Sequence, residues 1–158
     1  MADRYLLLYD ASGVLIRENE SGDKTRTNGS WESMSQLSGR TDAVQALVTE
    51  IPKDDAAVLM KEVTGLGLDR YLDIEVGAYG STDLASLVPQ AKAAAEAKYG
   101  PGLVTVAVAG PASVAALADV VDVVVALSTS DEPRAAGAKH VVKNLLELVP
   151  LVVENRVA

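Results

Sequence analysis

The chain has 158 residues and a mass of 16.5 kDa, enough for one domain with a hydrophobic core and too few for two full-sized domains. Its 14 basic and 22 acidic residues give a formal net charge of −8, which argues against nucleic acid as a partner because phosphate backbones select clustered positive charge. The absence of cysteine excludes disulfides, thiolate metal sites and cysteine nucleophiles, and the single histidine, His140, excludes a multi-histidine metal site.

Membrane association and export are also unexpected. No run of about 18 uncharged apolar residues predicts a membrane span. Residues 1–9 lack the basic start and long apolar stretch of a signal peptide. We therefore expect a cytoplasmic protein with no membrane partner.

The first elements are a strand, a loop and a helix. Residues 5–9 are almost wholly apolar, as in a strand buried on both faces. Residues 19–33 are polar, rich in Gly and Ser, and without periodicity, which indicates a loop. Residues 31–37 then predict a helix capped by Ser30 and ended by Gly39.

A second group follows the same alternation. Residues 43–48 predict a strand, and a helix opens after Pro52 and stops at Gly65 and Gly67. Residues 71–76 alternate polar and apolar side chains, which predicts a strand less deeply buried than the first.

The remaining residues continue the pattern to the end of the chain. The expected strands are 103–109, 123–127 and 139–142, and the expected helices are 83–99, 113–121, 132–136 and 144–149. This alternation predicts an α/β fold with a doubly wound, Rossmann-like parallel sheet and helices on both faces. Ligands bind beyond the carboxyl ends of the strands in such sheets. We therefore expect one crevice formed by Asp10, Ser12, Thr49, Gly77, Gly110 and Ser128.

Several segments resemble motifs of one enzyme superfamily, in the right order. YLLLYDASGVLI (residues 5–16) resembles the first motif of the haloacid dehalogenase (HAD) superfamily, an apolar strand ending in Asp-x-Asp-Gly-[Thr/Val]. Residues 42–73 are similar to its second motif, a strand with a terminal Thr followed by a helix. The GAYGS turn and helix in residues 76–95, and the close of residues 112–148, are similar to the phosphoglycolate-phosphatase-like branch.

The resemblance implies a single HAD-like core over residues 1–158. Members of this superfamily commonly insert a helical cap domain after the first strand. Here residues 17–41 form only a short loop and helix in its place, so we expect no cap domain and an open crevice.

The resemblance also implies catalytic roles. Asp10 stands where the family has its nucleophile toward phosphorus. Ser12 replaces the Asp that protonates the leaving group, a loss worth on the order of 10² to 10⁴ in rate. Thr49 matches the hydroxyl that contacts phosphate. Lys92 and Lys98 are the nearest candidates for the third-motif cation, although their place on an Ala-rich helix favours solvated lysines instead.

The metal motif departs most from the family. After the strand 103–109, where members place the carboxylates that hold Mg²⁺, the chain reads Gly110-Pro111-Ala112-Ser113. Mg²⁺ needs oxygen ligands, and Asp10 alone is thin support. Asp131 or Glu132 could replace the missing carboxylates, or could simply begin a helix. We therefore expect weak or absent Mg²⁺ binding and no other cofactor.

Three functional hypotheses follow. The first is a degenerate HAD-like protein with a binding, regulatory or assembly role, as a homodimer or with a protein partner. The second is a phosphomonoester hydrolase that forms an aspartyl-phosphate at Asp10 and therefore binds a small phosphorylated ligand. The third is altered, metal-free chemistry in the same crevice. His140 and Trp31 are expected to be structural.

Overall fold

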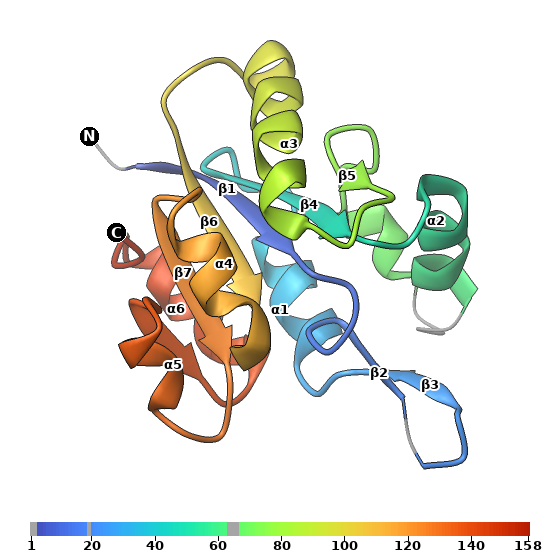
Figure 1. Ribbon diagram of the computed structural model, residues 1–158. Coiled ribbons are helices and arrows are strands. Elements are labelled where there is room, and N and C mark those ends of the chain that lie inside the picture. Colours follow the sequence, from blue (N-terminus) through green and yellow to red (C-terminus); the bar gives the residue numbers. More distant parts are fainter. Residues whose placement is uncertain (1–2, 19, 63–66) are drawn as a thin grey trace.

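The computed structural model describes residues 3–18, 20–62 and 67–158 and shows a parallel sheet between two layers of helices (Figure 1). The sheet has six strands in the order β5-β4-β1-β6-β7-β8, all parallel. Its strands are β1 (Arg4–Tyr9), β4 (Ala43–Thr49), β5 (Ala78–Tyr79), β6 (Leu103–Ala109), β7 (Val123–Leu127) and β8 (His140–Val142). The predicted doubly wound α/β fold is confirmed.

Helices cover both faces of the sheet. They are α1 (Ser30–Leu37), α2 (Lys53–Glu62), α3 (Leu84–Tyr99), α4 (Val114–Ala118), α5 (Glu132–Ala135) and α6 (Leu148–Val153), with short 3₁₀ turns at Leu68–Tyr71, Pro111–Ser113 and Leu145–Glu147. The α3 and α4 side chains pack on one face, and those of α1, α2 and α6 pack on the other. Within the described residues, no helix is both long enough and apolar enough to span a bilayer.

Strand β1 lies at the centre of both hydrophobic layers. Each of its residues from Tyr5 to Tyr9 is completely buried. Successive strand side chains point to opposite faces, so Tyr5, Leu7 and Tyr9 join one core and Leu6 and Leu8 join the other. This two-sided burial explains why the segment reads as an unbroken apolar run.

The prediction of a strand at residues 71–76 is wrong. The chain there leaves a 3₁₀ turn at Tyr71 and bends around Asp73, whose backbone N–H donates to the Gln45 carbonyl at 2.7 Å. The Asp73 carboxylate accepts hydrogen bonds from the Tyr99 hydroxyl and the Val76 amide. These polar contacts hold residues 71–76 in a turn, although their polar and apolar side chains alternate as in a strand. The edge strand β5 follows this turn.

The segment between β1 and β4 is more ordered than predicted. Part of the expected loop is an antiparallel hairpin of β2 (Ile16–Glu18) and β3 (Lys24–Arg26), followed by α1, and the described residues there form no helical cap domain. Ser30 does not cap α1 from outside, because it is the first helical residue and its hydroxyl donates to the Thr27 carbonyl. The cap position is Gly29, with φ +79°.

The other predicted helices differ in their limits. The helix after Pro52 is α2, and its expected stop at Gly65 lies outside the described residues. The helix predicted at 113–121 is the shorter α4. The last predicted helix begins as a 3₁₀ turn, where Asn144 and Glu147 form a capping box, and continues as α6.

A buried hydrogen-bond chain ties β1 to α1 through β4. The Tyr9 hydroxyl donates to Gln45 Oε1 at 2.7 Å, and Gln45 Nε2 donates to the Met34 carbonyl at 3.1 Å. We expect Tyr9→Phe to lower the free energy of unfolding by about 1 to 3 kcal/mol, because it leaves a buried amide oxygen unsatisfied. Urea unfolding measures this loss. Tyr71→Phe is the control, since Tyr71 is only partly buried. An equal loss of stability in both variants would contradict the stabilising role of these buried hydrogen bonds.

Candidate functional site

Asp10 is the first residue after β1, at the carboxyl edge of the sheet. Its strand pairs with β4 on one side and β6 on the other, and the Asp10 N–H donates to the Val108 carbonyl at 3.3 Å. The half-buried carboxylate accepts a hydrogen bond from the Ser12 amide at 3.2 Å. Burial raises the pKa of Asp10 to about 6; the Ser12 amide opposes this shift and the negative charge of Glu50 adds to it.

The turn after Asp10 exposes Ser12 beside it. Gly13 has φ +82°, a left-handed conformation that suits glycine, and its N–H donates to the Ile16 carbonyl at 2.7 Å. The Ile16 N–H in turn donates to the Ala11 carbonyl at 3.0 Å. This tight loop presents the Ser12 side chain to solvent and to a cavity of about 240 Å³ that also touches the hairpin and α2.

Thr49 ends β4, the strand next to β1, and so lies at the same edge as Asp10. Its side chain is fully buried, and its hydroxyl oxygen accepts from the Ile51 amide at 3.3 Å. The hydroxyl therefore shapes the turn after β4, and its own proton can still be donated.

The other predicted crevice residues divide according to the strands they follow. Gly110 and Ser128 directly follow β6 and β7, so they share the edge with Asp10. Gly77 does not follow a strand, because it precedes β5. The carboxyl end of that edge strand is at Gly80, whose N–H donates to the Thr49 carbonyl at 3.1 Å.

Both candidate lysines lie at the opposite end of the sheet. Lys92 lines a hollow together with Leu103 and Val123, the first residues of β6 and β7. A strand the length of β6 spans roughly 20 Å, so Lys92 cannot reach a phosphate at Asp10. We therefore drop the catalytic assignment of Lys92.

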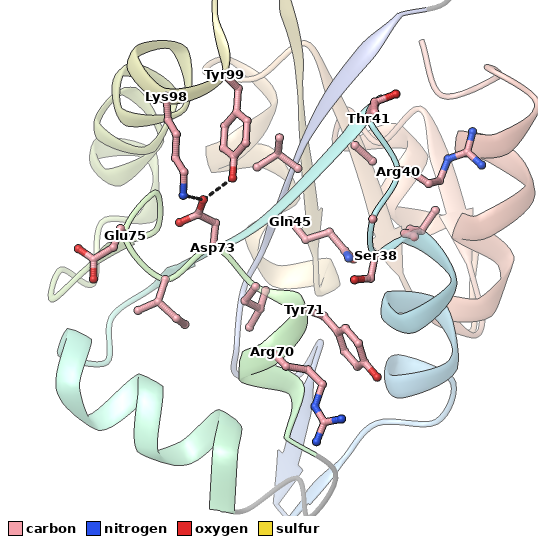
Figure 2. Close-up of a pocket in the computed structure, with 16 residues that line it drawn as sticks. Ser38, Arg40, Thr41, Gln45, Arg70, Tyr71, Asp73, Glu75, Lys98 and Tyr99 are labelled. Carbon is pink, nitrogen blue, oxygen red and sulfur yellow. Dashed lines mark hydrogen bonds and ion pairs between the residues drawn. The ribbon is translucent and has the colours of Figure 1, made fainter.

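Lys98 borders a cavity of about 730 Å³ beside the first residues of β4 (Figure 2). Its ammonium lies 2.6 Å from the Asp73 carboxylate, which the Tyr99 hydroxyl also contacts. Burial by itself raises the pKa of Asp73, but the hydrogen bonds from Lys98 and Tyr99 bring it below its ordinary value. This cluster holds the end of α3 against the turn at Asp73, which is a structural role.

Several solved structures share the fold of this chain. The chain matches a cobalt-bound deoxy-D-mannose-octulosonate 8-phosphate phosphatase from Haemophilus influenzae with a TM-score of 0.66 at 11% identity, over 98% of this chain and 90% of that one. It matches a structure described as a HAD superfamily (subfamily III A) hydrolase from Legionella pneumophila with a TM-score of 0.62 at 15% identity, over 97% and 84%. The fold is HAD-like.

A third neighbour was determined with ligands. The 3-deoxy-D-manno-octulosonate 8-phosphate phosphatase from Moraxella catarrhalis, in complex with magnesium ion, phosphate ion and KDO, matches with a TM-score of 0.59 at 15% identity, over 96% of this chain and 87% of that one. No protein-family model and no curated protein matches the sequence. The phosphoglycolate-phosphatase branch therefore stays a prediction.

Two neighbours are described with a metal ion, cobalt in one and magnesium in the other, so a metal ion is compatible with this fold. Asp10 supplies one carboxylate, and the loop Gly110–Ser113 after β6 supplies none. Among the residues that the structure describes, no group of three or more acidic or histidine side chains could hold a metal ion. These residues do not fit a resident divalent ion without further oxygens from a bound ligand and water.

Asp131 and Glu132 were the predicted replacements for the missing carboxylates. Both are exposed at the start of α5, beyond β7, and the Asp131 carboxylate lies 3.5 Å from the Arg134 guanidinium. Asp131 thus lies at the same edge of the sheet as Asp10, but its observed contact is the one with Arg134, at the start of α5. His140 is structural, since its Nε2 hydrogen-bonds the Val157 carbonyl oxygen at 2.7 Å.

Sequence reasoning missed the basic residues of this edge. Arg17 and Lys24, on the two hairpin strands, line the cavity beside Ser12. Lys143 follows β8 and lines a neighbouring cavity together with Arg17. The signal available in the sequence was that Arg17 and Lys143 each directly follow a short apolar run, as residues at the mouth of a parallel sheet do.

The raised pKa of Asp10 predicts a dependence of stability on pH. The folded chain holds this proton up to about pH 6, whereas the unfolded chain releases it near pH 4. The free energy of unfolding of the native chain therefore falls between these two pH values, and Asp10→Asn escapes that loss. We expect the free energy of unfolding of Asp10→Asn, measured relative to that of the native chain, to be about 1 to 2 kcal/mol higher at pH 7.5 than at pH 4. This range allows for the partial solvent exposure of Asp10.

Urea unfolding of both proteins at several pH values measures this difference. Asp131→Asn, the same substitution at a carboxylate that is 86% exposed, controls for the loss of one negative charge. A stability difference for Asp10→Asn that does not change between pH 4 and pH 7.5 would show that Asp10 is not desolvated in the fold.

Proposed function

We propose that the chain is a HAD-type phosphohydrolase that acts on a small phosphomonoester with Asp10 as its nucleophile. The observation that carries this proposal is the position of Asp10, a half-buried carboxylate directly after the central strand. The neighbours named as phosphatases, together with the motif around Asp10, support the same chemistry.

The reaction proceeds in two displacements at phosphorus. An Asp10 carboxylate oxygen forms a bond to phosphorus while the bond to the ester oxygen breaks. Water then attacks the aspartyl-phosphate, so that inorganic phosphate leaves and the carboxylate is restored. Because the pKa of Asp10 is raised to about 6, the nucleophile is mostly ionised at neutral pH and becomes protonated in mild acid.

Neighbouring groups assist to different degrees. The exposed Ser12 hydroxyl can donate a hydrogen bond to the leaving oxygen, whose proton then comes from water, because a serine hydroxyl is a poor proton donor. Lys24 and Arg17 line the cavity beside Ser12 together with Glu18, so the lining keeps one net positive charge that can offset the charge of the phosphoryl group. We therefore expect slow turnover.

A second candidate function is binding of a small phosphorylated ligand without turnover. The residues that favour it are Ser12, in place of the family's acid, and the loop after β6, which has no carboxylate. Such a protein would have a regulatory or assembly role, as a homodimer or with a protein partner.

Two substitutions at the turn separate these functions. We expect Asp10→Asn to abolish release of phosphate from p-nitrophenyl phosphate. We expect Ser12→Asp to raise turnover on the order of 10²-fold, because it supplies the missing general acid. Initial rates are measured with and without Mg²⁺.

Asp119→Asn, at an exposed carboxylate directly after α4, is the matched control and should leave the rate unchanged. No turnover above background in either the native chain or Ser12→Asp would overturn the hydrolase proposal. Phosphate binding to the same inactive protein, followed by NMR shifts of Ser12 and Gly13, would then support the binding function.

A further inference from the structure

A second cavity opens on the carboxyl edge of the sheet, on the other side of the hairpin from α2. It has a volume of about 290 Å³ and lies between Gly13, the hairpin, the start of α1 and the ends of β7 and β8. Its polar side chains are Arg17, Thr27, Asn28, Ser128, Thr129, Lys143 and Asn144. None of the described residues that line it is acidic, in a chain of net charge −8.

The fold explains why two cations meet here. In β2, Ile16 is 5% exposed and packs into the core, so the next side chain, Arg17, points outward. In β8, Val142 is 4% exposed, and the chain emerges from the sheet at Lys143. Both strands therefore deliver a basic side chain to solvent at the same edge.

Neither cation is paired with an acidic side chain among the residues that the structure describes. Arg17 and Lys143 form no ion pair with another described residue. Glu147, on the same turn, accepts from the Lys143 and Asn144 amides at 2.7 and 2.9 Å, so its carboxylate serves the capping box and does not line the cavity. The described lining of the cavity therefore carries two cations and no carboxylate, and it offers neutral donors from Ser128 and Asn28.

We propose that this cavity is an anion subsite in which Arg17 and Lys143 bind a second anionic group, a carboxylate, of the phosphorylated ligand. The inference rests on the proposed function, because it places the phosphoryl group of that ligand at Asp10. The cavity lies at the ends of β7 and β8, which are two and three strand spacings from β1, so the two anionic groups lie roughly 10 to 15 Å apart, or less where long side chains reach inward. The ligand class is therefore a phosphorylated acid rather than a simple phosphate ester.

Matched ligand pairs test this inference by calorimetry. Each pair keeps the phosphate and exchanges a carboxylate for an alcohol: 3-phosphoglycerate with glycerol 3-phosphate, and the longer 6-phosphogluconate with sorbitol 6-phosphate. We expect the native chain and Asp10→Asn to bind the acid of at least one pair about 10-fold more tightly than its alcohol.

Three variants locate the preference. Lys143→Gln should reduce the preference for the acid to less than about 3-fold, chiefly because the acid binds more weakly. Arg17→Gln should reduce the preference equally and should also lower the affinity for the alcohol, because Arg17 borders the cavity beside Ser12 as well. Lys139→Gln makes the same charge change at the other end of β8, where Lys139 lines a different hollow, and should leave the preference intact.

Equal affinity for acid and alcohol in both pairs overturns the inference. So does a preference that survives in Lys143→Gln and Arg17→Gln, or one that Lys139→Gln reduces equally, since the cause is then overall charge. A preference for the acid in a protein without turnover sustains the subsite and refutes only the hydrolase. Turnover of p-nitrophenyl phosphate without any preference refutes only the subsite.

Discussion

The pairing of β1 with two parallel neighbours is the constraint on which the rest of the structure depends. Its five consecutive residues from Tyr5 to Tyr9 are completely buried, and burial of one large apolar side chain contributes about 1.5 to 3 kcal/mol. A strand held on both edges and both faces cannot shift its register without exposing these side chains. Asp10 therefore stands at a fixed position where the chain leaves the sheet.

The same constraint explains the electrostatics of the carboxyl edge. Asp10 is too close to the core to be fully hydrated, and this desolvation raises its pKa to about 6. Perturbed carboxylates of this kind are enriched at functional sites. The basic side chains of this edge come from the hairpin and from the residue that follows β8. The hairpin lies between the two cavities, and Arg17 borders both of them.

Two misread segments show how tertiary contacts override a local pattern. Residues 71–76 alternate like a strand, but their polar members are used in a turn, where Asp73 holds Tyr99 and Lys98. The segment after β1 reads as a polar loop, yet it folds back on itself because Ile16 is buried in the core and β2 pairs with β3. Short strands with one buried side chain carry too little periodicity to be recognised.

The amino-acid sequence by itself determined the apolar strands, the parallel α/β sheet, the place of Asp10 at its edge, and the lack of a carboxylate in the loop after β6. These features are local, because each depends on a few consecutive side chains. Only the tertiary structure decided which cations lie at the carboxyl edge of the sheet. It places Lys92 and Lys98 at the amino ends of the strands, and it brings Arg17 and Lys143 from distant parts of the chain to one cavity. Strand order and helix direction set these positions, and both arise from packing between segments that are remote in the sequence.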